Sequence, residues 1–297
     1  MPVLRWAGGL FSVLFLGTAA ASPARAIESM KIAEFTAGLD RLVAIWEDVH
    51  NLHDYLRELQ TVVLVVGDSL VIFEPDSDGI AYEYQSTVAA PFPMASGIRA
   101  AFPLQATQGR PACVVGEDIF ESEENLILLL HEFVHCSQGN TVEYEIKATL
   151  AIATEATERG DFMWELEHPF PYADPEFVLS YSAMNASLLA GDAERALAER
   201  AKLRAHLSAI DYEYMVWEEW KEGLARYLEN RIQERRGLPV NTFGDEPPYD
   251  RIAFYHGGAH WIAYLVRMDP ALDADPKALF EAMRLFGGPL PPPPRRQ

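Results

Sequence analysis

The sequence predicts an α+β fold, and two observations lead to this prediction. Four short runs of β-branched and apolar residues lie between residues 61 and 115, whereas helical patterns occupy most of the chain from residue 122 onward. Strands followed by a series of helices are typical of α+β architecture rather than of alternating βαβ units. The composition, with 49% hydrophobic and 23% charged residues, is that of a globular protein able to bury a sizeable core.

The first 26 residues have the pattern of an export signal. Arg5 is the single charge before the apolar stretch 7–20, and Ala24-Arg25-Ala26 has the small-x-small pattern that signal peptidases cleave. That apolar stretch is shorter than the roughly 20 residues that cross a bilayer, which disfavours an uncleaved anchor. We therefore expect a signal peptide at 1–26 and an exported protein, periplasmic or secreted, with no stable membrane insertion.

An amphipathic helix and a small sheet are predicted next. Ile32, Phe35 and Leu39 recur at helical spacing, which predicts one long helix or two short ones over 28–59. Strands are predicted at 61–66, 70–73, 80–87 and 112–115, with Gly67-Asp68-Ser69 as a hairpin turn between the first two. Pro and Gly residues predict a loop over 90–103.

The second half is predicted to be helical. Helices are expected at 122–138, 141–159, 175–189, 192–206, 208–236, 248–267 and 276–286, several of them ended by glycine. We expect a single catalytic domain over 27–288, with an N-terminal lobe at about 27–140 and a helical lobe at about 141–288. The Pro-rich tail 289–297 is expected to be extended.

Charge and cysteine content limit the partners and leave one question open. The chain has 24 Lys and Arg against 44 Asp and Glu, a net charge of −20, which disfavours binding to nucleic acid or anionic lipid. Cys113 and Cys136 could form a disulfide between a strand and the following helix in an oxidising compartment. Two buried free thiols are the alternative, and the sequence leaves both open.

The strongest chemical signal is His131-Glu132-Phe133-Val134-His135, which matches His-Glu-x-x-His. Residues four apart lie one turn above each other on a helix, so His131 and His135 can bind a single Zn²⁺. Glu132 beside them can remove a proton from a metal-bound water. So short a motif also arises by chance. A third metal ligand at a suitable place in the sequence is therefore a stronger indication of a metal site than the motif alone.

Glu222 is the candidate for that third ligand. It lies on a predicted helix whose apolar face includes Trp217 and Trp220. Gly223 and Ala225 are small, which we expect to let this helix approach another helix closely enough for a short carboxylate to reach the metal. The alternatives are Glu218 and Glu219, and a solvated acidic edge is the interpretation that assigns no function to these acids.

These segments resemble the gluzincin metallopeptidases, in which two His and one Glu hold zinc. The resemblance rests on His-Glu-x-x-His followed on a later helix by Glu222-Gly223-Leu224-Ala225-Arg226-Tyr227. In addition, Tyr255-His256-Gly257-Gly258-Ala259 resembles the Tyr-x-x-Gly-Ala segment of aminopeptidase N-like members. The resemblance implies a zincin-like fold, with His131, His135 and Glu222 as ligands, Glu132 as general base and Tyr255 as a donor to the transition state.

His256 and His260 are further polar aromatics on the same apolar segment as Tyr255. An imidazole aimed at a developing oxyanion would contribute to catalysis, so His256 is a second catalytic candidate after Tyr255. Packing of satisfied core residues is the alternative for these rings.

The expected function is that of an exported zinc metallopeptidase acting on a peptide or protein substrate, in which Glu132 activates a zinc-bound water. An edge strand of the sheet is expected to bind the extended substrate. One rival is a catalytically inactive, metal-containing binding protein. Another is a zinc-dependent amidohydrolase that acts on a non-peptide amide.

Overall fold

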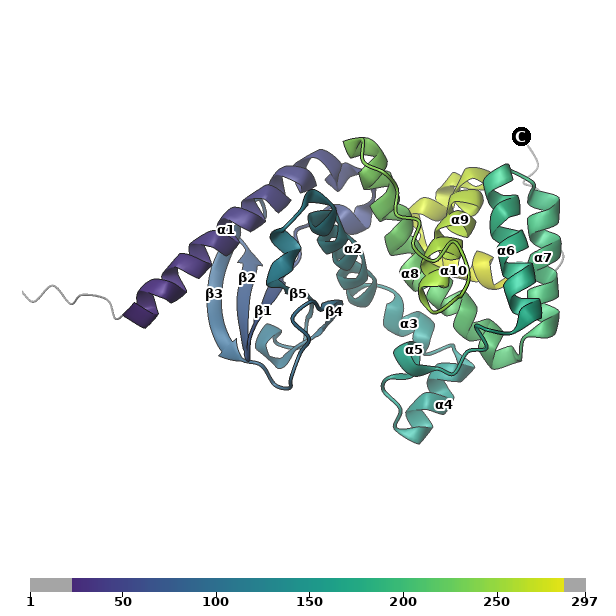
Figure 1. The fold of residues 1–297 in the computed structure, drawn as a ribbon, viewed down its shortest axis with the longest axis horizontal. Coiled ribbons are helices and arrows are strands. Elements are labelled where there is room, and N and C mark those ends of the chain that lie inside the picture. Colours follow the sequence, from purple (N-terminus) through teal and green to yellow (C-terminus); the bar gives the residue numbers. More distant parts are fainter. Residues whose placement is uncertain (1–22, 286–297) are drawn as a thin grey trace, which may run out of the picture.

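The computed structural model describes residues 23–285 and confirms the α+β class (Figure 1). The predicted signal peptide lies outside the described residues except for 23–26, which begin the first helix, and the predicted tail 289–297 lies wholly outside them. Among the described residues, no helix combines the length and apolarity needed to cross a membrane.

The N-terminal half contains a five-stranded mixed sheet in the order β3-β2-β1-β5-β4. Its strands are β1 (Val62–Val66), β2 (Ser69–Pro75), β3 (Tyr82–Ala89), β4 (Arg99–Pro103) and β5 (Pro111–Gly116). β1 and β5 are parallel, whereas the other neighbouring pairs are antiparallel. The predicted loop over 90–103 is wrong for its last five residues, because pairing with β5 makes them the edge strand β4. Pro103 is tolerated there since an edge strand has one unpaired side.

Helices α1 (Pro23–Val49) and α2 (Glu123–Asn140) cover one face of the sheet. Val62, Leu64 and Val115 point to this face and share a core with both helices. The opposite face is covered by the segment before β4, through residues such as Met94 and Ile98. α2 also packs against α8, so it lies between the sheet and the helical half (Figure 1).

The first helix ends earlier than the predicted range 28–59. After Val49 the chain forms two short 3-10 turns, His50–Leu52 and Asp54–Leu56. The His53 side chain accepts a hydrogen bond from the Tyr55 amide at 3.0 Å, and the Trp46 indole donates to the Leu56 carbonyl at 2.7 Å. These contacts fold the segment back onto α1 and lead it into β1.

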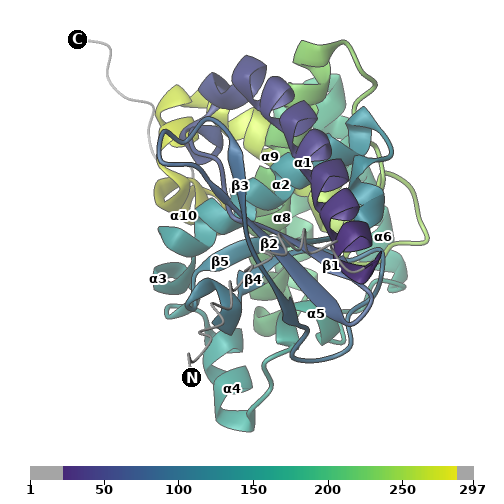
Figure 2. The ribbon, with the colours of Figure 1, turned by 90° about the vertical axis from the view of Figure 1, so that its left-hand side faces the viewer.

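The helical half contains the remaining helices, which lie behind the sheet in Figure 2. They are α3 (Glu143–Lys147), α4 (Ala151–Arg159), α5 (Trp164–Glu167), α6 (Pro175–Ala190), α7 (Ala193–His206), α8 (Ala209–Arg236), α9 (Ile252–Met268) and α10 (Pro276–Leu285). The predicted helix over 141–159 is therefore split, and α5 was not predicted. The split follows from a tertiary contact, because Glu213 of α8 accepts a hydrogen bond from the Ile152 amide in the first turn of α4.

The two cysteines lie where the sheet meets α2. Cys113 of β5 and Cys136 of α2 are both buried free thiols, with their sulfur atoms 3.4 Å apart. Burial raises the pKa of the Cys113 thiol well above its usual range, which keeps it protonated. Of the two alternatives that the sequence left open, the structure has the free thiols.

Candidate metal centre

The two motif histidines lie on α2, which forms a buried platform. The Ser122 hydroxyl caps its first turn by accepting a hydrogen bond from the Asn125 amide at 3.1 Å. From Leu129 to Cys136 every residue of the helix is buried, which fixes the His side chains in one orientation. The rings of His131 and His135 lie on one face with centroids 4.9 Å apart, as the four-residue spacing predicts.

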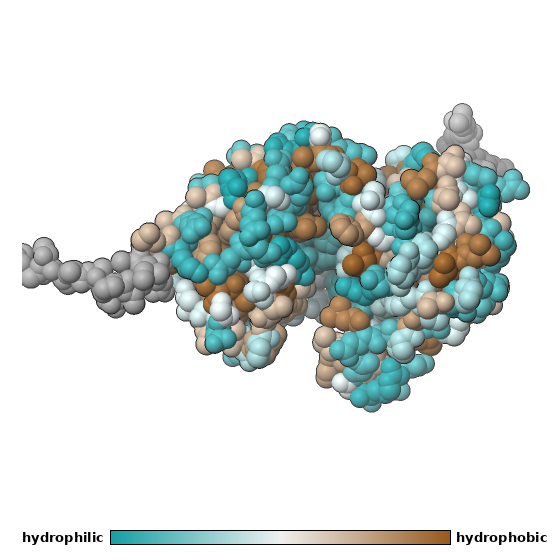
Figure 3. All heavy atoms as spheres, viewed as in Figure 1, coloured by the Kyte–Doolittle hydropathy of each residue, from teal (hydrophilic) through white to brown (hydrophobic). Residues whose placement is uncertain are grey.

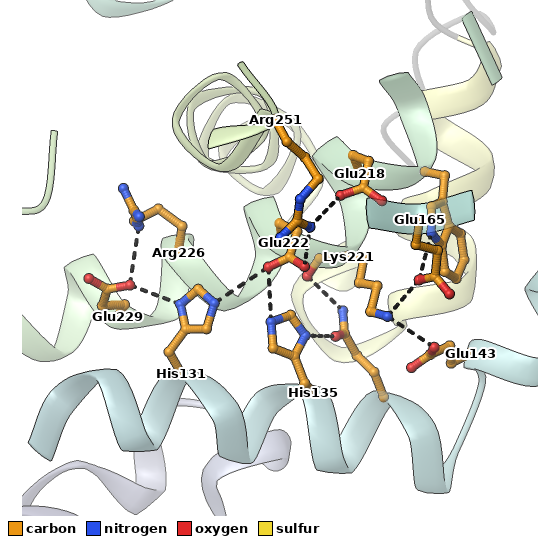
Figure 4. Close-up of polar contacts among 12 residues, drawn as sticks. His131, His135, Glu143, Glu165, Glu218, Lys221, Glu222, Arg226, Glu229 and Arg251 are labelled. Atoms are coloured by element: carbon orange, nitrogen blue, oxygen red, sulfur yellow. Dashed lines mark hydrogen bonds and ion pairs between the residues drawn. The ribbon is translucent and has the colours of Figure 1, made fainter. Parts of the chain in front are cut away.

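Glu222 of α8 faces both imidazoles, as predicted (Figure 4). Its Oε2 lies 3.1 Å from Nε2 of His135 and 3.7 Å from Nε2 of His131. Within residues 23–285, these three side chains form a buried group whose ligand atoms all lie within 4.8 Å of one another. Two His and one Glu are the protein ligands of several catalytic zinc sites, so the donor set fits Zn²⁺.

The other nitrogen of each imidazole is also held. Nδ1 of His131 lies 2.8 Å from Oε2 of Glu229, and Nδ1 of His135 lies 2.8 Å from Oε1 of Gln138. Gln138 in turn donates from Nε2 to the Lys221 carbonyl at 3.1 Å, next to Glu222. Hydrogen bonds of this kind orient metal-binding histidines and leave Nε2 with its lone pair toward the ion.

Sequence reasoning missed both of these partners. Glu229 lies seven residues after Glu222 and therefore two turns along the same face of α8, and Gln138 lies three residues after His135 on α2. These spacings were the available signal. From sequence alone, Glu229 is one more acid on the polar edge of this helix, but in the structure its side chain is fully buried.

Glu222 carries a negative charge in this buried place. Burial alone would raise its pKa, but the charges and hydrogen bonds of His135 and His131 hold the pKa of Glu222 well below its usual range. Burial opposes a charge on His131, yet the hydrogen bonds with Glu222 and Glu229 outweigh it and raise the pKa of His131 to about 9. The site is therefore electrostatically suited to a cation.

Glu132 follows His131 on α2. Its side chain is buried, and its Oε2 has no hydrogen-bond partner among residues 23–285. Burial raises the pKa of Glu132, although positive charge on His135 and His131 opposes this. A buried carboxylate with one free oxygen and a raised pKa has the properties of a general base.

Tyr255 of α9 lies beside the group. Its ring is stacked on that of His131, with centroids 6.0 Å apart and planes inclined by 16°. The guanidinium groups of Arg251 and Arg226 lie 5.3 and 5.5 Å from the centre of the Tyr255 ring. Burial, reinforced by the charge of Glu222, raises the pKa of Tyr255 well above its usual range, so the phenol keeps its proton and can donate it in a hydrogen bond.

His256 contacts different residues. Its Nε2 lies 3.1 Å from Oδ1 of Asp245 and 3.0 Å from Nε2 of His260. Both contacts are outside the group formed by His131, His135 and Glu222. The catalytic role of His256 stays a prediction, and the contacts favour a different use of this residue.

The alternative acids, Glu218 and Glu219, are paired with arginines. Oε2 of Glu218 lies 3.0 Å from Arg251, and Oε2 of Glu219 lies 2.6 Å from Arg200. Arg251 also contacts Oε1 of Glu222 at 3.1 Å, which leaves Oε2 of Glu222 toward the imidazoles. Of the three acids, Glu222 is the one that the structure brings to both histidines.

Gly223 does let α8 approach another helix closely, but that helix is α9. A Cβ atom on Gly223 would lie 2.6 Å from Cα of Gly258, so the close approach is to α9 and not to α2, which carries the two histidines. In the other direction, a Cβ atom on Gly258 would lie 2.2 Å from the Glu219 carbonyl oxygen. The contact still serves the site, because it holds Tyr255 of α9 close to α8.

Four alternating charges fix the chain beside Glu222. Lys221 lies 2.7 Å from Glu165 and 3.2 Å from Glu143 (Figure 4), while Lys147 lies 2.6 Å from each of these acids. This arrangement, which we call the Lys–Glu quartet, joins α3, α5 and α8. Its two positive and two negative charges cancel, so the Lys–Glu quartet does not compensate the charge of Glu222.

Comparison of the chain with models of known protein families, with curated protein sequences and with solved structures found no match.

Proposed function

We propose that this protein is an exported zinc-dependent metallopeptidase of the gluzincin type, with His131, His135 and Glu222 as zinc ligands. The observation that carries the proposal is the convergence of two Nε2 atoms and one carboxylate oxygen in a buried place, within 4.8 Å of one another. The bonds from Glu229 and Gln138 to the outer nitrogens support it, because a structural pair of histidines does not need both rings oriented in this way.

Bound zinc would supply Lewis acidity that makes water nucleophilic at neutral pH and polarises a carbonyl. Glu132 would take the proton of the attacking water on its unpaired Oε2 and later pass it to the leaving amine. Tyr255 would donate a hydrogen bond from its protonated phenol to the oxygen on which negative charge develops. Arg251 would hold Oε1 of Glu222 and thereby the orientation of this carboxylate.

In this proposal, the edge strand that binds the extended substrate is β4. It lies at one end of the sheet order and packs against α2, which carries the motif. Figure 3 shows a hollow in the surface between the sheet half and the segment α3–α5. An extended peptide paired with β4 would run along this hollow with its backbone hydrogen bonds satisfied.

The decisive experiment replaces the base and keeps the ligands. Glu132→Gln should lower hydrolysis of a peptide library by about 10²- to 10⁴-fold, because the variant cannot accept the proton. Its zinc content should equal that of the unchanged protein, and a chelator should abolish the activity of the latter. Glu124→Gln, an exposed acid on the same helix, is the matched control.

Full peptidase activity in Glu132→Gln would refute the mechanism. A protein that binds zinc but cleaves no peptide would instead support the inactive binding protein. The unpaired oxygen of Glu132 speaks against that outcome, since a purely structural metal site has no use for a buried carboxylate without a partner.

A further inference from the structure

Outside the group formed by His131, His135 and Glu222, two histidines and one aspartate lie together where the connection between α8 and α9 meets α9. His256 and His260 are four residues apart on α9, and Asp245 belongs to the preceding connection. Nε2 of His256 lies 3.0 Å from Nε2 of His260 and 3.1 Å from Oδ1 of Asp245. None of these residues is used by the proposed mechanism.

The geometry of this histidine pair resembles that of the first pair. The rings of His256 and His260 have centroids 4.3 Å apart and planes inclined by 81°, against 4.9 Å and 70° for His131 and His135. Two nitrogens at about 2.0–2.1 Å from one tetrahedral zinc are roughly 3.3 Å apart. The separation of 3.0 Å between the two Nε2 atoms is close to this value.

Asp245 is the candidate for the third donor. Its Oδ1 contacts His256 and its side chain is 45% exposed, so rotation of the carboxylate would bring it toward an ion held by both rings. Asp245 and Glu246 also line a surface cavity of about 350 Å³. Imidazole and carboxylate ligands together suit zinc and similar divalent transition metals.

The positive charge of Arg226, which lies against this connection, is already balanced. Arg226 reaches the connection by donating to the carbonyls of Asn241 and Phe243, but its Nε lies 3.1 Å from Glu229. Asp245 therefore remains available to offset the charge of an ion bound by the two histidines.

We propose that His256, His260 and Asp245 form a second site, which binds a divalent transition metal such as Zn²⁺ independently of His131, His135 and Glu222. An ion there joins the 241–249 connection to α9, on the helix that carries Tyr255. The site stabilises this part of the helical half, and the proposal does not depend on peptidase activity.

The test is the number of zinc ions bound per chain. The purified protein is stripped with a chelator, titrated with Zn²⁺ by calorimetry, and analysed for metal after dialysis. We expect two ions for the unchanged protein and one for His260→Gln, a mild change at a partly exposed position. His206→Ala, which removes another histidine paired with an aspartate, is the matched control and should leave two.

The double variant His131→Ala/His135→Ala separates the two sites. If it keeps one ion that His260→Gln removes, the second site is supported even if the first were wrong. Uptake of one ion by the unchanged protein, lost entirely in the double variant, would overturn the second site and leave the first intact. Uptake of two ions by His260→Gln would also overturn it. Circular dichroism of each variant checks that the loss of an ion is not a loss of fold.

Discussion

Glu229 offers the sharpest test of how the candidate centre is built. Its carboxylate lies 2.8 Å from Nδ1 of His131 and 3.1 Å from Nε of Arg226, and its side chain is fully buried. In Glu229→Gln the amide oxygen can still accept the hydrogen bond, but the negative charge is lost. In Glu229→Ala both are lost, and Arg226 is left without its carboxylate partner.

The expected magnitudes follow from these contacts. Loss of an outer partner of a metal-binding histidine lowers metal affinity by about 10- to 100-fold, equivalent to about 1.4–2.8 kcal/mol. Glu229→Gln should lie near the lower value because it keeps the hydrogen bond, and Glu229→Ala near the upper value because it frees the ring of His131. Glu234→Gln makes the same chemical change at an exposed position of α8 and should leave zinc affinity unaltered.

Competition with a chromophoric chelator of known zinc affinity measures these differences. Thermal unfolding of the metal-free proteins, recorded in parallel, separates weakened zinc binding from a general loss of stability. If both Glu229 variants bind zinc within about twofold of the unchanged protein, the bond from Glu229 does not orient His131 toward a metal, and the inference from it fails.

Two further changes test packing and charge. Gly258→Ala should lower the free energy of unfolding, measured in urea, by about 1–3 kcal/mol. The added Cβ would lie 2.2 Å from the Glu219 carbonyl oxygen and would force α8 and α9 apart. Unchanged stability would contradict this close packing. Glu165 has its pKa lowered from 4.5 to about 2: burial opposes this shift, but the charges of its two lysine partners outweigh it. Its ionisation therefore stabilises the fold fully above about pH 4.5, and this contribution is lost as the pH falls toward 2. Glu165→Gln should lower the free energy of unfolding at neutral pH and make it depend less on pH between about 2 and 4.5. If the variant loses stability in acid to the same extent as the unchanged protein does, the Lys–Glu quartet is not the cause of that loss.

Local patterns predicted the secondary structure well where packing agrees with them. Runs of β-branched and apolar residues placed β1 and β2, and glycine stops placed the ends of α4, α6 and α8. The misses share one physical origin, which is that contacts with distant parts of the chain decide the conformation. β4 exists because it pairs with β5, and α1 ends at Val49 because Trp46 holds the chain at Leu56.

The candidate site was predictable to the extent that its chemistry is local. His131 and His135 follow from a single helical turn, and Glu222 was found from the resemblance and from its place beside small residues. Glu229 and Gln138 could not be singled out, because an acid two turns from another is equally common on a solvated edge. The packing of α8 on α2 buries this edge of α8 and turns Glu222 and Glu229 toward the histidines.

The buried charges around the site give an independent reason to expect a divalent cation. The Lys–Glu quartet is neutral, and Arg200 balances Glu219. Glu199 is paired with Lys202, and the remaining buried acids are Glu132, Glu218, Glu222 and Glu229. The arginines that pair with them are Arg251, shared by two of these acids, and Arg226. Four carboxylates against two guanidinium groups and the protonated imidazole of His131 leave one negative charge uncompensated. Burial raises the pKa of Glu218 to about 8, and the charge of Glu222 adds to this rise, although Arg251 opposes it. A raised pKa is expected for an acid close to an excess of negative charge. A divalent ion that binds His131, His135 and Glu222 and displaces the proton of His131 adds one net positive charge and removes this excess, whereas a monovalent ion adds none.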